Sequence, residues 1–385
     1  MTAPPTLVWQ EQDQTRIARW RSESGNPVPR RVQLADDTLT ADAAYRLASE
    51  GTGLLWRGDF QNARQLLQAL ARRADKKPRR GDSAPVASGP EAFHLHRMKQ
   101  GQRARILATL LVQVEGDHSI ALRRAPDLRA AIDEAWGPAD GEPAVASLRE
   151  LLGLVGAHEW RKKGVEIAAL GAAPGNRIHA HYGVFSPVRG EYIDLVARAP
   201  LPATTLAYDI GTGTGVLAAV LARRGVQRVV ATDQDPRALA CARDNIARLG
   251  LAEQIELVEV DLFGAGRAPL VVCNPPWVPG RPSSPIEHAI YDEDSRMLRG
   301  FLAGVAAHLD AGGEAWLILS DLAEHLGLRT REQLLEWIAA GGLQVLGRIE
   351  ARPRHPKAAD PDDPLHAARS REVTALWRLG PQPTA

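Results

Sequence analysis

The chain has 385 residues, of which 44% are hydrophobic and 24% are charged, and its formal net charge is +1. These values are typical of a globular protein with enough apolar material for two domains. They exclude a strongly basic or acidic protein, and the sequence has no apolar run near the ~20 residues that a bilayer crossing needs. The start, MTAPPTLVWQEQDQTR, lacks the order of regions found in a signal peptide, so we expect a soluble, cytoplasmic protein.

The first 170 residues are predicted to form a mainly helical domain, because their apolar residues recur at helical spacing. Helices are expected at residues 40–51, 59–77, 91–116, 127–136 and 144–164. The first of them begins at Thr40, a favourable N-cap residue, and stops at a glycine. This part has no internal repeat and no catalytic signature, and we expect it to serve substrate recognition.

A basic stretch runs through this domain from Ala71 to Arg105, where ten Lys or Arg residues stand against three acidic residues, a net charge of +7. The basic residues are Arg72, Arg73, Lys76, Lys77, Arg79, Arg80, Arg97, Lys99, Arg103 and Arg105. They could contact the phosphates of a nucleic acid. The alternative is a solvated linker, because residues 75–90, DKKPRRGDSAPVASGP, are rich in Pro, Gly, Ser and charge.

The pattern changes near residue 204, where short apolar runs begin to alternate with helical segments. Strands are expected at 205–215, 228–233, 255–261, 269–274, 313–320, 343–350 and 371–379, and helices at 216–225, 236–250, 294–309 and 330–341. This alternation predicts an α/β domain over residues 171–385 with a doubly wound, mostly parallel, seven-stranded, Rossmann-like sheet. The only two cysteines, Cys241 and Cys273, fall in a helix and a strand of this domain, so we expect reduced packing thiols and no metal site.

The segment DIGTGTG occupies the first turn from strand to helix in this domain. Its glycines, Gly211, Gly213 and Gly215, would let backbone amides approach a ligand at the helix N-terminus. A dinucleotide fingerprint needs its third glycine one place later, where Val216 stands. Asp209 adds an acid that would repel a pyrophosphate but attract a sulfonium or an amino group.

Acidic residues also end the next two strands. Asp233 follows Gly211 by 22 residues, the place where a carboxylate can accept from both ribose hydroxyls of either NAD or S-adenosylmethionine. Asp261 is followed by Leu262 and Phe263, a pattern suited to the edge and face of an adenine. The alternative for each acid is that it only caps the next helix.

The fourth strand ends in NPPW, residues 274–277, and two prolines cannot continue a sheet ladder. The Asn274 side-chain oxygen and the Pro275 carbonyl could each accept one N–H of an amide or exocyclic amine, which aims the nitrogen lone pair at an electrophilic methyl group. Trp277 would offer an aromatic face to that planar group. The alternative is a proline-rich strand exit that packs an indole.

These motifs carry a family resemblance. From Ile178 to Leu379 the chain resembles the class I S-adenosylmethionine-dependent methyltransferases, on the segments DIGTGTG, ATDQDPRALACARDN and VVCNPPW. Within that class it is similar to N-methyltransferases with an N-P-P-aromatic motif, such as the HemK-like glutamine methyltransferases and the small-domain RNA guanine or adenine methyltransferases. Trp277 stands where HemK-like enzymes mostly have tyrosine, and the N-terminal part is roughly twice as long as theirs.

The resemblance implies a site residue by residue. Cofactor contacts are expected from Asp209, Gly211, Gly213 and Gly215 at the methionine part, from Asp233 at the ribose and from Asp261 with Leu262 at the adenine, and Thr212 and Gln234 are further cofactor-binding candidates. The acceptor nitrogen would lie at Asn274, Pro275, Pro276 and Trp277, with Asn274 also beside the cofactor. Phe185, Arg189 and Glu191 belong to a segment expected to fold over the cofactor, on the substrate side. The loop at residues 351–370, ARPRHPKAADPDDPLHAARS, is expected on the surface near the acceptor mouth.

The leading hypothesis is therefore an S-adenosylmethionine-dependent N-methyltransferase that acts on an RNA or DNA base or a protein glutamine. The alternatives are a small-molecule N-methyltransferase, a dinucleotide-dependent oxidoreductase, which would leave NPPW without a role, and a non-catalytic S-adenosylmethionine-binding protein.

Overall fold

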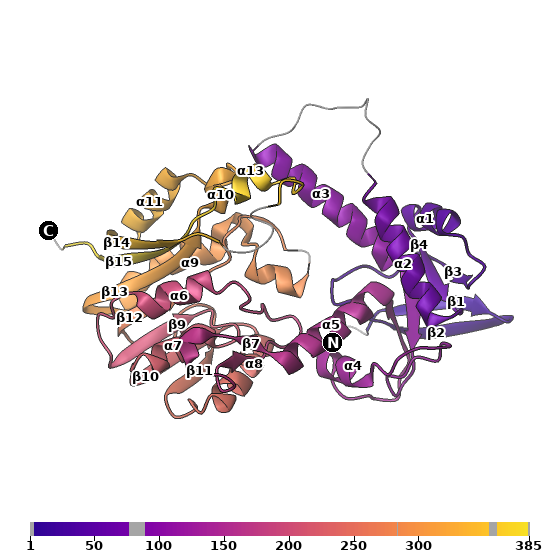
Figure 1. Cartoon of the computed structure of the whole chain (residues 1–385), viewed down its shortest axis with the longest axis horizontal. Helices are drawn as coiled ribbons and strands as arrows, with labels where there is room; N and C mark the ends of the chain where they lie inside the picture. The colour runs from indigo at the N-terminus through magenta and orange to yellow at the C-terminus, as the bar shows by residue number, and fades with distance from the viewer. Residues whose placement is uncertain (1–3, 77–88, 283, 354–359, 384–385) are drawn as a thin grey trace. The chain divides into compact units, whose positions relative to one another are not determined.

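The computed structural model describes residues 4–76, 89–282, 284–353 and 360–383, and the chain divides into two compact units (Figure 1). Unit 1 comprises Met1–Val86 and His94–Glu159, and unit 2 comprises Ala87–Phe93 and Trp160–Ala385. Helix α3 (Gly89–Ala108) therefore starts in unit 2 and continues into unit 1. Across the described residues, no helix combines the length and the apolar character that a transmembrane span requires.

Unit 1 is built on a six-stranded sheet with the order β1-β2-β6-β5-β4-β3. The strands are β1 (Thr6–Glu11), β2 (Gln14–Trp20), β3 (Arg31–Ala35), β4 (Thr52–Trp56), β5 (Leu110–Val114) and β6 (Ala144–Ser147). The helices are α1 (Ala41–Ser49), α2 (Phe60–Ala74), α3, α4 (Arg129–Trp136) and α5 (Leu148–Lys163), the last of which continues into unit 2. Strands β3, β4 and β5 run parallel, and β6 is antiparallel to β5.

The prediction of a mainly helical N-terminal domain is wrong. Its helices exist, and Thr40 caps α1 as expected, but the ends of two predicted helices are strands. Leu110–Val114 and Ala144–Ser147 are short, buried apolar runs, and periodicity alone cannot distinguish such a strand from a helix turn. Their pairing in one sheet, Val112 opposite Ala146, depends on contacts between residues far apart in the sequence.

Unit 2 contains a seven-stranded sheet with the order β11-β10-β9-β12-β13-β15-β14. The strands are β9 (Leu206–Ile210), β10 (Arg228–Asp233), β11 (Ile255–Glu259), β12 (Ala268–Cys273), β13 (Leu309–Ser320), β14 (Leu343–Ala351) and β15 (Thr374–Pro381). Strands β9 to β13 pair in parallel, and β15 is antiparallel to both β13 and β14. A strand lies at each of the seven predicted positions, although β11 ends two residues before Asp261.

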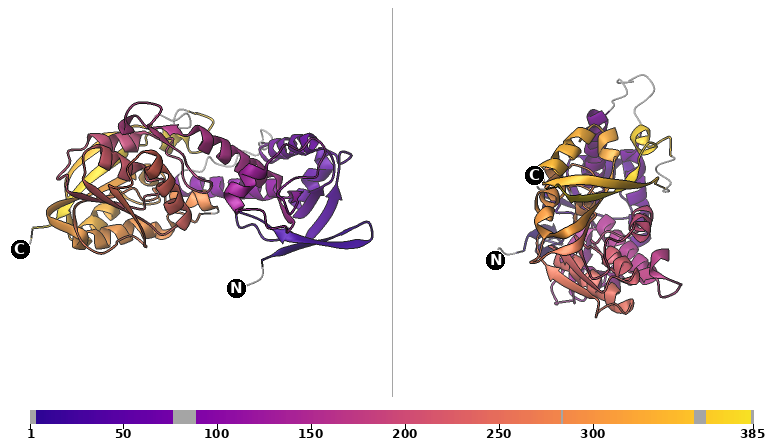
Figure 2. Two further views of the ribbon diagram at one scale, coloured as in Figure 1. Left: turned by 90° about the horizontal axis from the view of Figure 1, so that it is seen from below. Right: turned by 90° about the vertical axis from the view of Figure 1, so that its left-hand side faces the viewer.

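Helices cover both faces of this sheet (Figure 2). The first face carries α6 (Glu191–Arg198), α7 (Val216–Arg223) and α8 (Pro236–Arg248), and the second carries α9 (Arg296–Gly304) and α11 (Arg331–Ala340). Successive side chains of each strand point to opposite faces of the sheet, so that Ala207 belongs to one apolar cluster and Tyr208 to the other. The predicted helix 294–309 is interrupted, with 3-10 turns η3 (Glu293–Ser295) and η4 (Val305–His308) on either side of α9.

Smaller elements of unit 2 complete the fold. They are the strands β7 (Val165–Glu166) and β8 (Arg177–Ile178), the 3-10 turns η1 (Ala168–Leu170) and η2 (Pro285–Ala289), and the helices α10 (Leu322–His325) and α13 (His366–Arg369). Both cysteines are buried free thiols, as predicted, and burial raises the pKa of Cys241 to about 11.

Candidate active site

The glycine-rich turn after β9 has a backbone that only glycine adopts readily. The φ angles of Gly211, Gly213 and Gly215 are +71°, +56° and +80°. A Cβ atom on Gly211 would also lie 2.6 Å from Cε of Met297, a residue of α9. Glycine is therefore favoured at position 211 for two reasons, which are the positive φ and the Met297 side chain packed over it.

Asp209 supports this turn from inside the protein. It is 1% exposed, and its Oδ2 accepts hydrogen bonds from Thr212 Oγ1 at 2.7 Å and from the N–H of Ala218 at 3.0 Å. Burial raises the pKa of Asp209 to about 6. Asp209 therefore ties the turn to the first residues of α7.

Asp233 joins β10 to the same turn. Its Oδ2 accepts from the N–H of Gly213 at 3.0 Å, and its Oδ1 accepts from the N–H of Asp235 at 3.0 Å. Burial raises the pKa of Asp233 as well. A carboxylate offers about four lone-pair positions, so these two bonds leave capacity for a ligand hydroxyl. The neighbouring Gln234 is exposed.

Asp261 lies in the loop beyond β11 and forms an ion pair with Arg296 at 3.0 Å. The next residue, Leu262, has a φ of +67°, which is rare for a branched side chain and is typical of functional loops. Its carbonyl accepts from Thr232 Oγ1 at 2.7 Å, and a Cβ on Gly300 would lie 2.8 Å from its Cδ1. No local sequence signal predicted this backbone. The ring of Phe263 stacks on His308 at 4.5 Å, so that ring is engaged in packing beside α9.

Asn274 follows the last residue of β12, at the same edge of the sheet as the glycine turn, because Cys273 pairs with Ile210 in the parallel ladder. Its Oδ1 accepts a hydrogen bond of 2.8 Å from the indole Nε1–H of Trp277. The Trp277 ring meets Tyr192 of α6 edge-on, with ring centroids 6.5 Å apart. Between Asn274 and Trp277, Pro275 is buried and Pro276 is half-buried.

The chain beyond NPPW is closed into a loop that returns to the glycine turn. Val278 forms a β-bridge with Tyr291, and the buried carboxylate of Asp292 accepts from the N–H groups of Met297 and Leu298 at 3.0 and 3.1 Å. Asp292 thereby caps α9 and places Met297 over Gly211. No sequence pattern indicated this connection, since an N-capping role for Asp292 depends on where the loop folds.

The three substrate-side candidates lie just before α6 or at its first residue, and their surroundings differ. Glu191 is the first residue of α6 and is 9% exposed, and its Oε1 has no hydrogen-bond partner among the described residues. Arg189 lies 3.6 Å from Oε1 of Glu372, which also accepts from Ser320 Oγ at 2.7 Å. Phe185 is half-buried.

The described part of the 351–370 loop packs beside the NPPW segment, but Leu365 and Ala368 are buried, so it does not lie wholly on the surface as predicted, and its place near the acceptor mouth stays a prediction. Leu365 and Ala368 share an apolar cluster with Phe93 and Val278, and Trp277 packs against that cluster. Residues 354–359 lie outside the described part of the chain.

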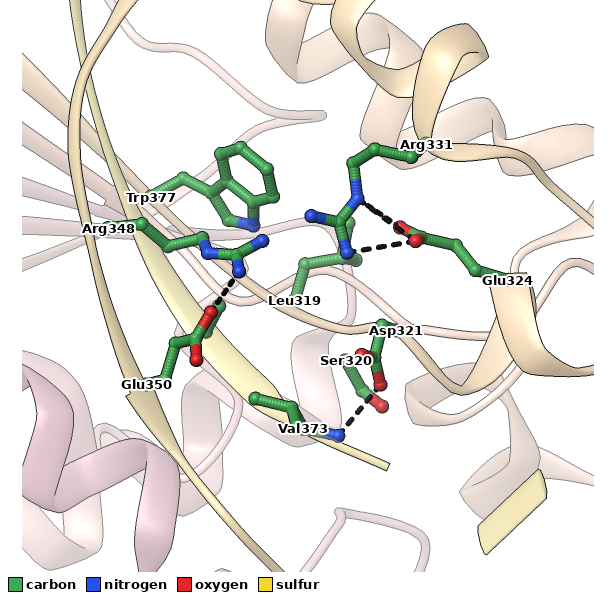
Figure 3. A pocket seen from close by; sticks show the side chains of 10 residues that line it. Leu319, Ser320, Asp321, Glu324, Arg331, Arg348, Glu350, Val373 and Trp377 are labelled. Carbon is green, nitrogen blue, oxygen red and sulfur yellow. Dashed lines mark hydrogen bonds and ion pairs between the residues drawn. The ribbon is translucent and has the colours of Figure 1, made fainter. Parts of the chain in front are cut away.

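A pocket of about 10 Å³ lies where β13 and β14 end and the antiparallel β15 begins (Figure 3). The guanidinium groups of Arg331 and Arg348 lie 5.1 and 4.9 Å from the Trp377 ring centroid, and each is also paired with an acid, Glu324 or Glu350. This volume holds about one water molecule, so we assign no substrate to it. A larger, open groove of about 500 Å³ runs between α9 and α11 and is lined by Arg296, Arg299 and Trp337 among others.

The basic stretch is only partly described, because Lys77, Arg79 and Arg80 lie outside the described residues. Within unit 1, Arg73 pairs with Asp42 at 2.8 Å and Arg103 pairs with Asp75 at 2.7 Å. The side chains of Arg72, Lys76, Lys99 and Arg105 are exposed.

Comparison with known proteins shows which family the sequence of this chain resembles. A family model for the methyltransferase small domain matches residues 175–332. A release factor glutamine methyltransferase from Cereibacter sphaeroides is 36% identical over 149 residues, which are 37% of this chain and 50% of that protein. A ribosomal protein L11 methyltransferase from Pelotomaculum thermopropionicum is 49% identical over 69 residues, 17% of this chain and 22% of that protein.

The chain thus spans half or less of the length of these two relatives. It spans nearly all of a third, a tRNA1(Val) (adenine(37)-N6)-methyltransferase from Shewanella amazonensis, which is 30% identical over 218 residues, 51% of this chain and 92% of that protein. The motifs, the seven-stranded sheet and these matches agree: the chain belongs to the methyltransferase small domain family of class I, S-adenosylmethionine-dependent methyltransferases.

Proposed function

We propose that this protein is an N-methyltransferase that transfers the methyl group of S-adenosylmethionine to an amide or exocyclic amino nitrogen of a macromolecule. The observation that carries the proposal is the position of Asn274. Its amide follows β12 at the sheet edge where the glycine turn follows the neighbouring β9. In open α/β sheets, ligands bind at the carboxyl ends of the strands where the strand order reverses, and β9 lies at that point here.

The residues at this edge fit S-adenosylmethionine. The positive φ angles of the glycine turn let its backbone approach a ligand closely, and Asp233 retains lone pairs for ribose hydroxyls. The buried Oε1 of Glu191, with no partner among the described residues, suits a cationic group such as an amine. The residues that would hold the cofactor are Asp209, Gly211, Thr212, Gly213, Gly215, Asp233, Gln234, Asp261, Leu262 and Asn274, with Phe185, Arg189 and Glu191 in the covering segment.

The bound cofactor supplies an electrophilic methyl group on a sulfonium. The protein's part is to prepare the acceptor nitrogen, which is a poor nucleophile because its lone pair is delocalised. Asn274 Oδ1 and the Pro275 carbonyl each accept one N–H, so that the lone pair points at the methyl carbon. Transfer to this nitrogen would break the S–C bond of the donor as the N–C bond forms, and it would make the nitrogen acidic enough to release its proton to solvent.

A macromolecular acceptor is supported by the relatives, whose names specify a release factor glutamine, an adenine of tRNA and a ribosomal protein. The exposed basic residues of unit 1 also favour a large anionic acceptor, with unit 1 serving recognition and unit 2, whose long segment begins at Trp160 and not at the predicted residue 171, carrying the chemistry.

The test is methyl transfer from labelled S-adenosylmethionine to purified RNA, ribosomal fractions and release factors, with Asn274→Ala as the matched control. Label in one acceptor class, lost in the variant, supports the proposal. Cofactor binding without transfer to any of these classes, under conditions where a related enzyme is active, would make the protein a non-catalytic binder.

A further inference from the structure

The indole of Trp277 is fixed by packing on several sides. Its ring is partly buried against three apolar clusters of unit 2 and meets the ring of Tyr192 edge-on, at an interplanar angle of 85°. Tyr192 is itself 5% exposed. The direction of the Trp277 N–H is therefore set by the core of the unit.

This fixed N–H meets the oxygen of the Asn274 amide at 2.8 Å. An amide side chain has nearly the same shape after a half-turn about its last bond, but the half-turn exchanges an acceptor for two donors. An indole nitrogen can only donate, so the reversed Asn274 amide would set a donor against a donor. The indole thereby selects the orientation in which Oδ1 occupies this position.

The consequence concerns the lone pairs of Oδ1. One lone pair accepts from the indole, and the second stays available for an N–H of the acceptor. A reversed amide would present N–H groups to the substrate N–H and could not hold the nitrogen for attack. The two intervening prolines, Pro275 and Pro276, restrict the backbone and so limit the movement of the Asn274 and Trp277 side chains relative to each other.

We propose that Trp277 is a positioning residue, which acts on methyl transfer by holding the Asn274 amide in the accepting orientation. The proposal rests on the N-methyltransferase function proposed above. It assigns to the indole N–H a task that the phenyl ring of phenylalanine cannot perform and that differs from offering a stacking face to the acceptor.

The first test needs no acceptor or cofactor. In the ¹⁵N spectrum of the full chain, the Trp277 indole resonance is identified by its loss in Trp277→Phe. Asn274→Ala should shift that resonance toward the frequency of free indoles and speed its hydrogen exchange by at least roughly tenfold, since the N–H loses its partner. An unchanged resonance and exchange rate would overturn the proposal, even if the protein proves to be a methyltransferase.

The second test is a double-variant cycle on the transfer rate. Trp277→Phe should lower kcat by roughly tenfold while the affinity for S-adenosylmethionine stays within about twofold, and it should add almost nothing to Asn274→Ala. Losses that multiply in the double variant would mean that Trp277 acts independently, for example by stacking, and a faster Trp277→Phe enzyme would mean that the indole competes with the acceptor. Either result contradicts the proposal.

Trp316→Phe is the matched control, because it removes another indole hydrogen bond, to Glu314 at 3.0 Å, within the sheet core. It should lower the melting temperature without changing kcat or the Trp277 resonance. Failure of the parent function is separate from these outcomes: it would appear as no transfer by the wild-type protein, while the indole measurement still decides whether the hydrogen bond exists.

Discussion

The Oδ2 atom of Asp233 accepts a hydrogen bond of 3.0 Å from the N–H of Gly213, so the acid at the end of β10 and the glycine turn after β9 hold each other in place. The same carboxylate is the group proposed to bind the cofactor ribose. Substitution of Asp233 therefore removes this structural contact together with the proposed ribose contact.

We expect Asp233→Ala to weaken binding of S-adenosylmethionine by about 1.5–3 kcal/mol, because charge-assisted hydrogen bonds to the ribose are removed. Isothermal titration calorimetry measures this directly. Asp235→Ala is the control, since Asp235 caps α8 by accepting from the N–H of Arg237 at 2.9 Å. It should cost about 1 kcal/mol of stability and leave the affinity unchanged. Tight binding of NADH with no heat from S-adenosylmethionine would contradict the cofactor assignment.

The buried carboxyl of Asp209 predicts a pH dependence of stability. Its pKa rises from 3.8 to about 6 on folding. Between these two values the folded protein binds more protons than the unfolded chain, so this group's contribution to the free energy of unfolding falls as pH increases. Relative to Asp209→Asn, the wild type should lose about 2–3 kcal/mol between pH 4 and pH 7. Denaturant titrations of both proteins across this range measure it, and a constant difference would show that Asp209 ionises normally.

The affinity for the cofactor is expected to change with pH in the opposite direction to the stability. A ligand with a positive charge near Asp209 favours the ionised carboxylate, so binding should tighten by roughly five- to tenfold from pH 5 to pH 7. Asp209→Asn should flatten this dependence. An equal pH dependence in both proteins would assign it to another group.

Gly211 and Gly213 offer a matched pair of substitutions. Gly213→Ala should cost only the strain of a positive φ, about 1–2 kcal/mol, because no atom lies within 4 Å of the added Cβ. Gly211→Ala adds the 2.6 Å approach to Met297 Cε and should cost more. In the Gly211→Ala/Met297→Ala variant the extra cost should largely disappear, as measured by chemical denaturation. Equal costs for the two alanine variants would show that Met297 moves aside freely.

Substitution of basic residues on α3 tests whether this surface binds nucleic acid or is only solvated. Lys99→Glu/Arg105→Glu should weaken RNA binding and reduce the slope of log K against log salt by about 1 for each phosphate that is no longer neutralised. Arg46→Glu on α1 serves as the control, because Arg46 is exposed and paired with Glu50. The same salt slope in the wild type and the double variant would support the solvated interpretation.

The strands of unit 2 were predictable because each has its own local signature. Leu206–Ile210, Arg228–Asp233 and Ala268–Cys273 are short apolar runs bounded by glycine, proline or acids, and each leads into a recognisable turn. The acids and glycines at their ends could be assigned to one edge because parallel strands share their carboxyl ends.

Other features depend on contacts that no local pattern encodes. The run Leu110–Val114 continues the helical pattern of α3 in the sequence, and only its pairing with β4 and β6 makes it a strand. The positive φ of Leu262, the capping of α9 by Asp292 and the hydrogen bond from Trp277 to Asn274 likewise arise from the folded loop. The aromatic residue of NPPW was expected to offer a face, and the structure shows its edge engaged with the asparagine.

The central claim is that Asn274 prepares the acceptor nitrogen. The most direct measurement is the methylation rate of Asn274→Ala, with cofactor affinity and thermal stability determined on the same sample. We expect the rate to fall by roughly 10²–10³-fold, the effect of removing one preorganised hydrogen-bond acceptor, while the affinity for S-adenosylmethionine stays within about threefold. Asn274→Asp should keep partial activity, since it retains the accepting oxygen. An Asn274→Ala protein that folds, binds the cofactor and methylates at the wild-type rate would contradict the claim and the assignment as an N-methyltransferase.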